Sequence, residues 1–427
     1  MSSDGATKLK AFRARYIPED PQIRTIALAL LINTFGNGLF GTLEVIYFTQ
    51  VVGLTPAQVG LGLSIAGGIS LCFSIPAGQL SDRFGPRNLA VTSFVLEGVL
   101  TSLIMFVHSF AGFVLVATIG GIASTTTQTF RMATIARIGG PENSVQLRAF
   151  TRSVVNLGIG LGTVFAGIAL SIDTLVAYNT TVVIDALTFL LAAFIWSKLP
   201  VLEPTVERGS KLIFTALRDR RYLLATLSNG FNSLHFVVMG VALPLWVIHE
   251  TTAPRWLVAF MMVLNTICVV LFQMSASKGS EELHNGAKYF ARASLLVAVA
   301  CVIYAAAHGL SPLLASLVLI LATLVHVAGE LIGSAGSWSI GFGLADRSKQ
   351  GEYQGVWSLG MGIGGTVGPA FVTTMVIGLG QTGWLILGLL FIANGFLMHR
   401  NVTGNWGAYG KLQSADKNAD EAVDLST

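Results

Sequence analysis

Glu330 lies in VHVAGELIGSAGSW (325–338), one of the most apolar stretches of the chain, and His326 precedes it by one helical turn. Residues i and i+4 share a helix face, so the two side chains are predicted to be neighbours. If this helix crosses a bilayer, an ionised carboxylate at its centre costs at least about 2.5–3.5 kcal/mol, so the group must be neutral, paired or facing water. A buried carboxylate without a partner becomes a proton carrier, and histidine titrates near physiological pH. The spacing therefore predicts a proton-carrying site.

The composition indicates that such helices do cross a membrane. Of the 427 residues, 53% are hydrophobic and 11% are charged, whereas a soluble domain carries about 25% charged residues. Apolar stretches of about 20 residues recur along the chain, each long enough to span the hydrocarbon core as a helix. The 47 glycines and 12 prolines suit closely packed, bent helices better than a β-barrel. We expect an all-α integral membrane protein.

Twelve membrane-spanning helices are predicted, six on each side of a charged segment. The predicted spans cover residues 23–51, 56–80, 88–108, 111–138, 146–171, 175–197, 221–248, 255–275, 288–307, 312–342, 354–378 and 382–400. The predicted domains are an N-terminal segment (1–22), a six-helix bundle (23–197), a linker (198–220), a second six-helix bundle (221–400) and a tail (401–427). NLGIGLG in the fifth span matches SLGMGIG in the eleventh, which favours two pseudo-symmetric bundles with a site at their interface.

Positive charge is distributed unevenly among the predicted loops. Of the 26 Lys and Arg residues, only Arg255 falls in a loop that alternation places outside. This asymmetry follows the positive-inside rule and predicts that both termini are cytoplasmic, in a bacterial inner (plasma) membrane. It also explains the net charge of +4 without a nucleic-acid partner. We expect a monomer whose partners are the lipid bilayer, protons and a small-molecule substrate.

A charged segment, PAGQLSDRFGPRNL (76–89), separates the second and third spans. Gly78, Asp82, Arg83, Gly85 and Arg87 stand in an order that resembles the signature loop of the major facilitator superfamily. The proline at position 86 replaces the first of the two final basic residues of that signature. The resemblance covers residues 23–400. It implies a cytoplasmic latch, in which the aspartate faces the N-terminal end of the eleventh helix and the basic residue joins a charge network.

A second feature is similar to the drug:proton antiporter branch of that superfamily. The eleventh span carries Gly364, Gly368 and Pro369, like the glycine–proline motif that antiporters have in their fifth span. The fifth span of this chain keeps the glycines but lacks the proline, and the stretch of the fourth span that corresponds to the antiporters' arginine motif has no arginine.

Four predicted spans carry a polar stripe along one helix face. The stripes are Asn33, Asn37 and Glu44; Ser124, Gln128 and Arg131; Ser228, Asn232 and His235; and His326, Glu330, Ser334 and Ser337. They fall on the first, fourth, seventh and tenth spans, and the resemblance implies that these four helices line a central cavity. The expected substrate-cavity residues are Asn33, Asn37, Gln128, Asn232, His235, Ser334 and Trp338. Interhelical hydrogen bonding is the alternative for the Ser and Asn members.

The carboxylates within the spans are assigned different roles. Glu330 with His326, and then Glu44, are the predicted proton-coupling groups. Glu97 and Asp185 belong to the third and sixth spans, which in the superfamily pack at the periphery, so we interpret them as structural.

Two arginines near the start of the fifth span, Arg148 and Arg152, are interpreted as anchors of its cytoplasmic end. This interpretation places them away from the predicted proton-coupling site.

These observations favour a secondary active transporter that exports amphipathic small molecules against a proton gradient by alternating access. A proton symporter that imports a metabolite uses the same parts and remains an alternative, as does a lipid translocator. The sequence contains no serine–histidine set, P-loop or His/Asp metal cluster at a plausible spacing, which argues against an enzyme. We therefore expect no catalytic residues, no cofactor and no bound metal, with the proton gradient as the driving force.

Overall fold

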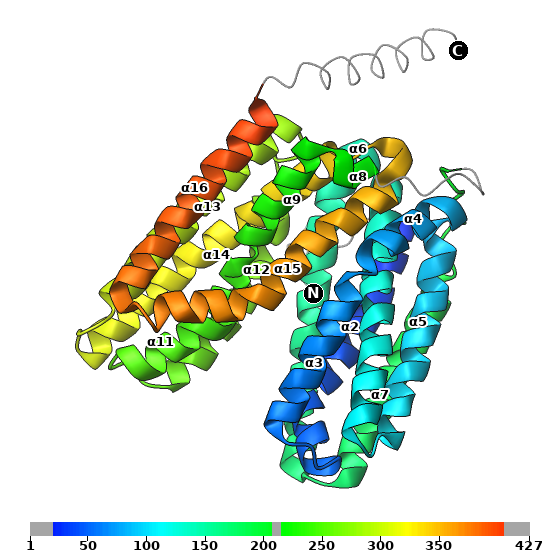
Figure 1. Cartoon of the computed structure of the whole chain (residues 1–427), viewed down its shortest axis with the longest axis horizontal. Helices are drawn as coiled ribbons and strands as arrows, with labels where there is room; N and C mark the ends of the chain where they lie inside the picture. Colours follow the sequence, from blue (N-terminus) through cyan, green and yellow to red (C-terminus); the bar gives the residue numbers. More distant parts are fainter. Residues whose placement is uncertain (1–19, 207–214, 405–427) are drawn as a thin grey trace, which may run out of the picture.

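The computed structural model describes residues 20–206 and 215–404, and within these two ranges every regular element is a helix (Figure 1). Eleven helices are long and apolar enough to cross a membrane, and a bent pair, Gln58–Leu71 and Ser74–Phe84, makes a twelfth span. The predicted all-α, twelve-helix membrane fold is therefore confirmed. Most of the predicted N-terminal segment, the middle of the predicted linker and most of the predicted tail lie outside the described residues.

The first bundle begins with α2, which continues into a π-helix. Its elements are α2 (Pro21–Ile46), η1 (Tyr47–Val51), α3 (Pro56–Leu71), α4 (Ser74–Phe84), α5 (Pro86–Leu103), η2 (Ile104–Phe106), α6 (Phe110–Ile172) and α7 (Leu175–Trp196). Polar N-caps begin several of these helices: the side chains of Asp20, Thr55, Ser109 and Thr174 each accept a hydrogen bond from a backbone N–H of the first turn. Proline, which suits the first helical position, follows two of these caps.

The second bundle also begins with a span that contains a π-helical segment. Its elements are α8 (Thr215–Arg218), α9 (Arg220–Asn232), α10 (Leu234–Val237), η3 (Val238–Ala242), α11 (Leu243–Glu250), α12 (Trp256–Ala276), α13 (Leu283–Ala306), α14 (Pro312–Gly343), η4 (Arg347–Lys349), α15 (Gln350–Val376) and α16 (Gly380–Thr403). Elements α9 to α11 together form one membrane-crossing unit, Arg220–Glu250.

The predicted spans 111–138 and 146–171 correspond to two membrane-crossing helices, Phe110–Gly140 and Asn143–Ile172, within the long element α6. They meet at a kink at Gly140, whose φ of 61° and ψ of −174° are not helical. The second predicted span, 56–80, ends too early, because α4 continues to Phe84 and includes Asp82 and Arg83. Only Gly85, with φ 81°, makes the turn before α5, a conformation that glycine adopts without strain.

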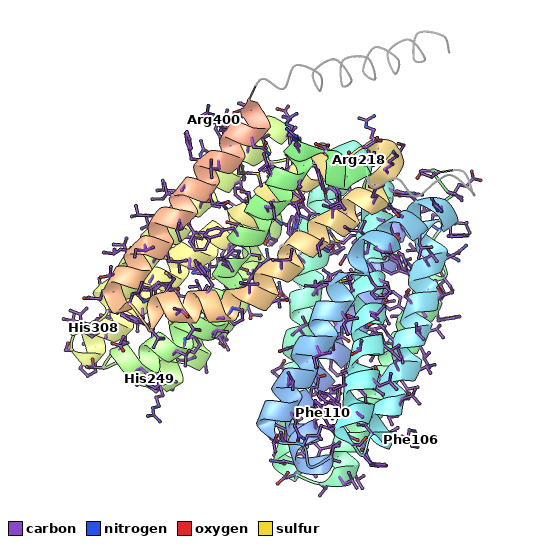
Figure 2. The ribbon with its side chains drawn as sticks, viewed as in Figure 1. Phe106, Phe110, Arg218, His249, His308 and Arg400 are labelled. Atoms are coloured by element: carbon purple, nitrogen blue, oxygen red, sulfur yellow. The ribbon has the colours of Figure 1, made fainter. Side chains whose placement is uncertain are left out.

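The two bundles converge at one end of the molecule and diverge toward the other (Figure 1). We call the converging end, which carries residues 198–206 and α8, the linker end. Arg218 and Arg400 lie at this end, whereas His249 and His308 lie at the opposite end (Figure 2). This arrangement agrees with the uneven charge distribution of the sequence, and the orientation of the linker end toward the cytoplasm stays a prediction.

Close packing inside the first bundle depends on small residues of α6. A Cβ atom added at Gly162 would lie 2.6 Å from the backbone nitrogen of Leu39 and 2.9 Å from the carbonyl carbon of Gly38, both on α2. Glycines at helix interfaces allow such an approach of two backbones in membranes. Along the same helix, a Cβ at Gly167 would meet nothing within 4 Å.

We expect Gly162→Ala to lower the free energy of unfolding by about 1–3 kcal/mol, because α2 must move away from α6 to admit the methyl group. Gly167→Ala is the matched control and should be neutral or stabilising by up to about 1 kcal/mol, since alanine favours the helix. Thermal unfolding of the purified variants in detergent measures the difference. Equal unfolding temperatures for the two variants would contradict the close packing.

Candidate functional site between the two bundles

At the linker end, Asp82 of α4 joins the first bundle to the second. Its Oδ1 accepts a hydrogen bond from the backbone N–H of Gly351 at 2.8 Å, and its Oδ2 accepts one from that of Glu352 at 2.9 Å. These N–H groups belong to the first turn of α15, where a carboxylate is favoured by unpaired donors and by the helix dipole. Arg137 of α6 adds an ion pair with Oδ1 at 3.3 Å. The carboxylate of Asp82 therefore has three partners from two helices.

Backbone packing supports this contact. A Cβ at Gly78 would lie 2.6 Å from the carbonyl carbon of Gly351, so α4 and α15 can cross here only with glycine. The start of the linker also bonds to α4: the backbone carbonyl of Asp82 accepts a hydrogen bond from the backbone N–H of Thr205 at 2.8 Å. Arg87 donates to the carbonyl of Leu199 at 3.1 Å.

The remaining residues of the predicted gate motif also lie at the linker end: Arg83 is partly buried in α4, and Gly85 is buried. The arrangement matches the contact that the resemblance implied, and its role as a latch remains a prediction.

Deeper between the bundles, Glu330 of α14 forms an ion pair with Arg152 of α6. Arg152 donates one hydrogen bond to Oε1 of Glu330 and another to the hydroxyl of Ser334. Asn265 of α12 donates to Oε2 of Glu330 at 2.8 Å. Both carboxylate oxygens are therefore bonded, and the residue is only 3% exposed. Because Arg152 belongs to the first bundle and the other three residues to the second, this ion pair crosses the bundle interface.

Of the three possibilities for Glu330, neutral, paired or facing water, this conformation shows the paired one, and His326 is not its hydrogen-bonding partner. Glu330 is paired with a cation, and neither ring nitrogen of His326 has a hydrogen-bond partner within the described part of the chain. The interpretation of Arg152 as an end anchor is wrong. Neither Arg152 nor Asn265 was proposed for this site, because the spacing of residues along one helix cannot identify a partner on another helix.

Three other predicted site residues lie near this ion pair. His235 of α10 faces His326, with ring centroids 5.5 Å apart. The ring of Trp338 lies 5.9 Å from the guanidinium of Arg152 and 5.8 Å from that of Arg148. Ser334 accepts from Arg152, as described above. The structure thus gathers residues from α6, α10, α12 and α14 at the interface.

The other predicted cavity residues are dispersed. Asn232 is buried beside α14, where a Cβ at Gly333 would lie 3.9 Å from its amide nitrogen. Asn33 is buried in the first bundle, and its amide nitrogen has no partner among the described residues. Gln128 is exposed. Asn37 lines a different cavity, together with Glu44. The predicted set therefore does not form one continuous site in this conformation.

This cavity lies inside the first bundle and has a volume of about 370 Å³. Three carboxylates line it: Glu44 of α2, Glu97 of α5 and Asp185 of α7. Oε1 of Glu97 and Oδ1 of Asp185 are buried without a hydrogen-bond partner in the described ranges. The interpretation of Glu97 and Asp185 as peripheral residues missed that both reach the cavity that contains Glu44.

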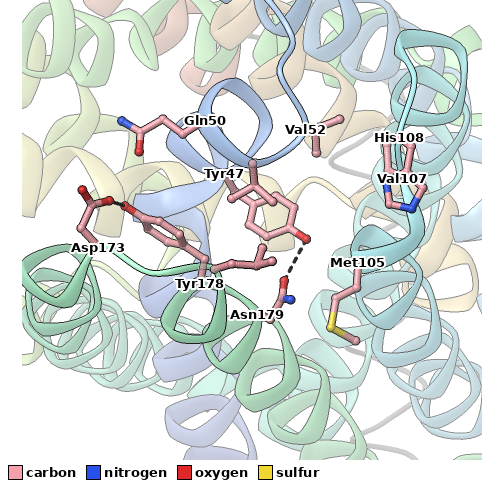
Figure 3. A pocket seen from close by; sticks show the side chains of 11 residues that line it. Tyr47, Gln50, Val52, Met105, Val107, His108, Asp173, Tyr178 and Asn179 are labelled. Atoms are coloured by element: carbon pink, nitrogen blue, oxygen red, sulfur yellow. Dashed lines mark hydrogen bonds between the residues drawn. The ribbon is translucent and has the colours of Figure 1, made fainter.

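Another hollow in the first bundle, of about 480 Å³, is shown in Figure 3. Two of its lining residues, Val107 and His108, lie between Phe106 and Phe110, at the end opposite the linker (Figure 2). Tyr47 donates to Oδ1 of Asn179 at 3.1 Å, and Tyr178 donates to Oδ1 of Asp173 at 2.6 Å. No predicted site residue lines this hollow. Four of its polar groups bond to one another in these two pairs, so we do not regard it as the functional site.

The family follows from comparison with known proteins. A family model described as the Major Facilitator Superfamily matches residues 26–369. The chain belongs to the Major Facilitator Superfamily. It is 25% identical over 364 residues to an uncharacterised MFS-type transporter of Methanocaldococcus jannaschii, covering 82% of this chain and 89% of that protein. It is 23% identical over 369 residues to the multidrug resistance protein MdtH of Cronobacter sakazakii, covering 83% and 87% of the two chains.

Solved structures of MFS transporters share the fold. The human organic anion transporter MFSD10 (TETRAN) superposes with a TM-score of 0.69 at 18% identity, covering 89% of this chain and all of that one. A bacterial homologue of the iron transporter ferroportin in an outward-facing state gives a TM-score of 0.71 at 12% identity, covering 90% and 98%. The protein is therefore a multi-pass membrane transporter.

Proposed function

We propose that this transporter exports amphipathic small molecules in exchange for protons, by alternating access at the bundle interface. The ion pair between Arg152 and Glu330 is the observation that carries this proposal, because it joins the two bundles through a carboxylate that can accept a proton. A secondary transporter of this family moves its bundles against each other around such an interface. The charge of Glu330 determines whether the ion pair between the bundles forms. Proton binding to this carboxylate can therefore be coupled to the movement of the bundles.

The proposed coupling follows from the charges. An ionised Glu330 holds Arg152, and protonation removes the negative charge that Arg152 requires, so the contact between the bundles weakens. A cationic amphipathic substrate has the same effect, since it can replace Arg152 beside the carboxylate. Two aromatic rings can form cation–π contacts with such a substrate. The ring of Phe236 lies 5.4 Å and that of Trp338 5.9 Å from the guanidinium of Arg152. Proton and substrate thus compete for one site, which is the requirement for exchange.

In this proposal the latch at Asp82 closes the cytoplasmic side, so the conformation described here is outward-facing. The positive charge near the linker end and the divergence of the bundles at the other end support this orientation. The name of the relative MdtH, a multidrug resistance protein, favours export over import. Import of a metabolite and movement of lipid remain the alternatives.

Everted membrane vesicles that hold an acidic interior test the proposal. We expect amphipathic cations to discharge the proton gradient in vesicles containing the wild-type protein, and to discharge it at least about tenfold more slowly in Glu330→Gln. A pH-sensitive dye reports the gradient, and the protein content of each preparation is matched. Glu250→Gln, which changes a partly exposed carboxylate at the end of α11, is the control and should behave as wild type.

Each other result would weaken a different part of the proposal. Equal discharge in wild type and Glu330→Gln would remove Glu330 from proton coupling, and Glu44→Gln would then test the cavity in the first bundle. Discharge only when the gradient and substrate run in the same direction would indicate a symporter. Movement of labelled phospholipid without any response to soluble compounds would indicate a lipid translocator.

A further inference from the structure

Three metal-ligating side chains meet beside the ion pair at the bundle interface. His235 comes from α10, and His326 and Glu330 lie one turn apart on the same face of α14. One ligand atom from each of these residues lies within 4.8 Å of the other two, and all three residues are buried. Within the described ranges, this is the one group of three or more His, Cys, Asp or Glu residues with that geometry.

The two histidines lack the partners that buried polar groups normally have. Both ring nitrogens of His326 lack a hydrogen-bond partner among the described residues, and so does Nδ1 of His235. Buried polar side chains without partners are uncommon, because each loses its contact with water and gains nothing in exchange. A histidine with two unbonded ring nitrogens beside a second imidazole and a carboxylate is free to coordinate an ion.

We propose that His235, His326 and Glu330 bind a divalent first-row transition-metal ion such as Zn²⁺ or Co²⁺. Two imidazoles and one carboxylate form a donor set that such ions accept, with further positions left for water or another ligand. Mg²⁺ and Ca²⁺ prefer oxygen donors, so the two histidines select against them. The proposal shares Glu330 with the proposed function but does not depend on the direction or the substrate of transport.

The ion and Arg152 compete for Glu330. All three ligands belong to the second bundle, whereas Arg152 belongs to the first. The metal ion and the guanidinium of Arg152 repel each other, so the ion binds more tightly when Arg152 withdraws. Asn265 can keep its hydrogen bond to Oε2, because each carboxylate oxygen accepts more than one contact. Metal binding therefore opposes the ion pair that joins the bundles.

Titration of the full-length protein tests this site directly. The protein carries an affinity tag without histidine, is reconstituted in nanodiscs and is treated with EDTA before use. Zn²⁺ binding is measured by calorimetry, and Co²⁺ binding by the visible absorption of the coordinated ion. We expect one site in wild type and a loss of affinity of at least about tenfold in His235→Ala and in His326→Asn. Arg152→Gln should bind more tightly than wild type, because the competing cation is gone.

The controls separate this site from other outcomes. His308→Ala changes an exposed histidine at the opposite end and should leave the affinity unchanged. Thermal unfolding without metal identifies any variant that fails to fold. Equal affinities for wild type and the double variant His235→Ala/His326→Asn would overturn the site, as would the absence of binding to both wild type and Arg152→Gln. The vesicle assay, run in EDTA, tests the proposed function separately, so either proposal can fail alone.

Discussion

Arg152→Gln is expected to lower the free energy of unfolding by about 3–5 kcal/mol, because it leaves Glu330 as a buried carboxylate without its cation. The side chains of these two residues are only 14% and 4% exposed, so water cannot replace the lost partner. Asn265 remains as a donor, but one neutral amide does not balance a full charge. Thermal or chemical unfolding in detergent micelles measures the change. Arg255→Gln, at an exposed position before α12, serves as the control for loss of a positive charge.

The double variant Arg152→Gln/Glu330→Gln distinguishes an ion pair from two independent contributions. Glu330→Gln alone also destabilises the protein, since it leaves Arg152 buried without its anion. We expect the double variant to recover most of the stability, because neither buried charge remains and the two amides can bond to each other. The three variants form a double-mutant cycle. If the loss in unfolding free energy of the double variant equalled the sum of the losses in the two single variants, the two charges would not stabilise each other.

Asp82→Asn is expected to open the linker end. The substitution removes the negative charge that accepts from Gly351 and Glu352 and that pairs with Arg137. Hydrogen bonds to a charged group contribute about 1.5–3 kcal/mol each, so weakening one or two of them shifts the equilibrium between conformations by about ten- to a hundredfold or more. The shift is toward the state in which α4 and the start of α15 are apart.

Distances between spin labels at the linker end measure this opening. The labels replace Asn88 on α5 and Arg400 on α16, two exposed positions, after the three native cysteines have been changed to serine. We expect a longer-distance population to appear or to grow in Asp82→Asn. Asp346→Asn, which changes the exposed N-cap of η4 nearby, is the control. An unchanged distance distribution would show that Asp82 does not hold the linker end closed.

The sequence predicted the helical fold well because each feature that it used is local. A membrane span needs only about 20 apolar residues in a row, and eleven helices with one bent pair meet that criterion. The resemblance to the superfamily's signature loop implied that Asp82 faces the start of the eleventh span, and its carboxylate does bond to Gly351 and Glu352 there. The predicted span ended at residue 80, whereas α4 continues to Phe84, because the charged residues and Gly85 of this segment resemble a turn.

The site was harder to predict because its key contacts join different helices. Glu330 was found from its polarity in an apolar segment, but Arg152 lies on α6 and Asn265 on α12, at positions that no spacing relates to α14. The carboxylates of Glu97 and Asp185 reach one cavity because α5 and α7 both pack beside it, which depends on how each helix is rotated. One signal could have identified Arg152: a buried carboxylate in a membrane requires a cation, and few arginines lie inside predicted spans.

The ion pair at the interface also has an electrical consequence. While Arg152 and Glu330 are bonded, their charges cancel, so movement of the bundles around them carries no net charge from these groups through the membrane field. Once a proton occupies Glu330, the charge of Arg152 is unbalanced, and moving one full elementary charge across 100 mV involves about 2.3 kcal/mol. The membrane voltage would therefore act on the protonated form and leave the paired form unaffected.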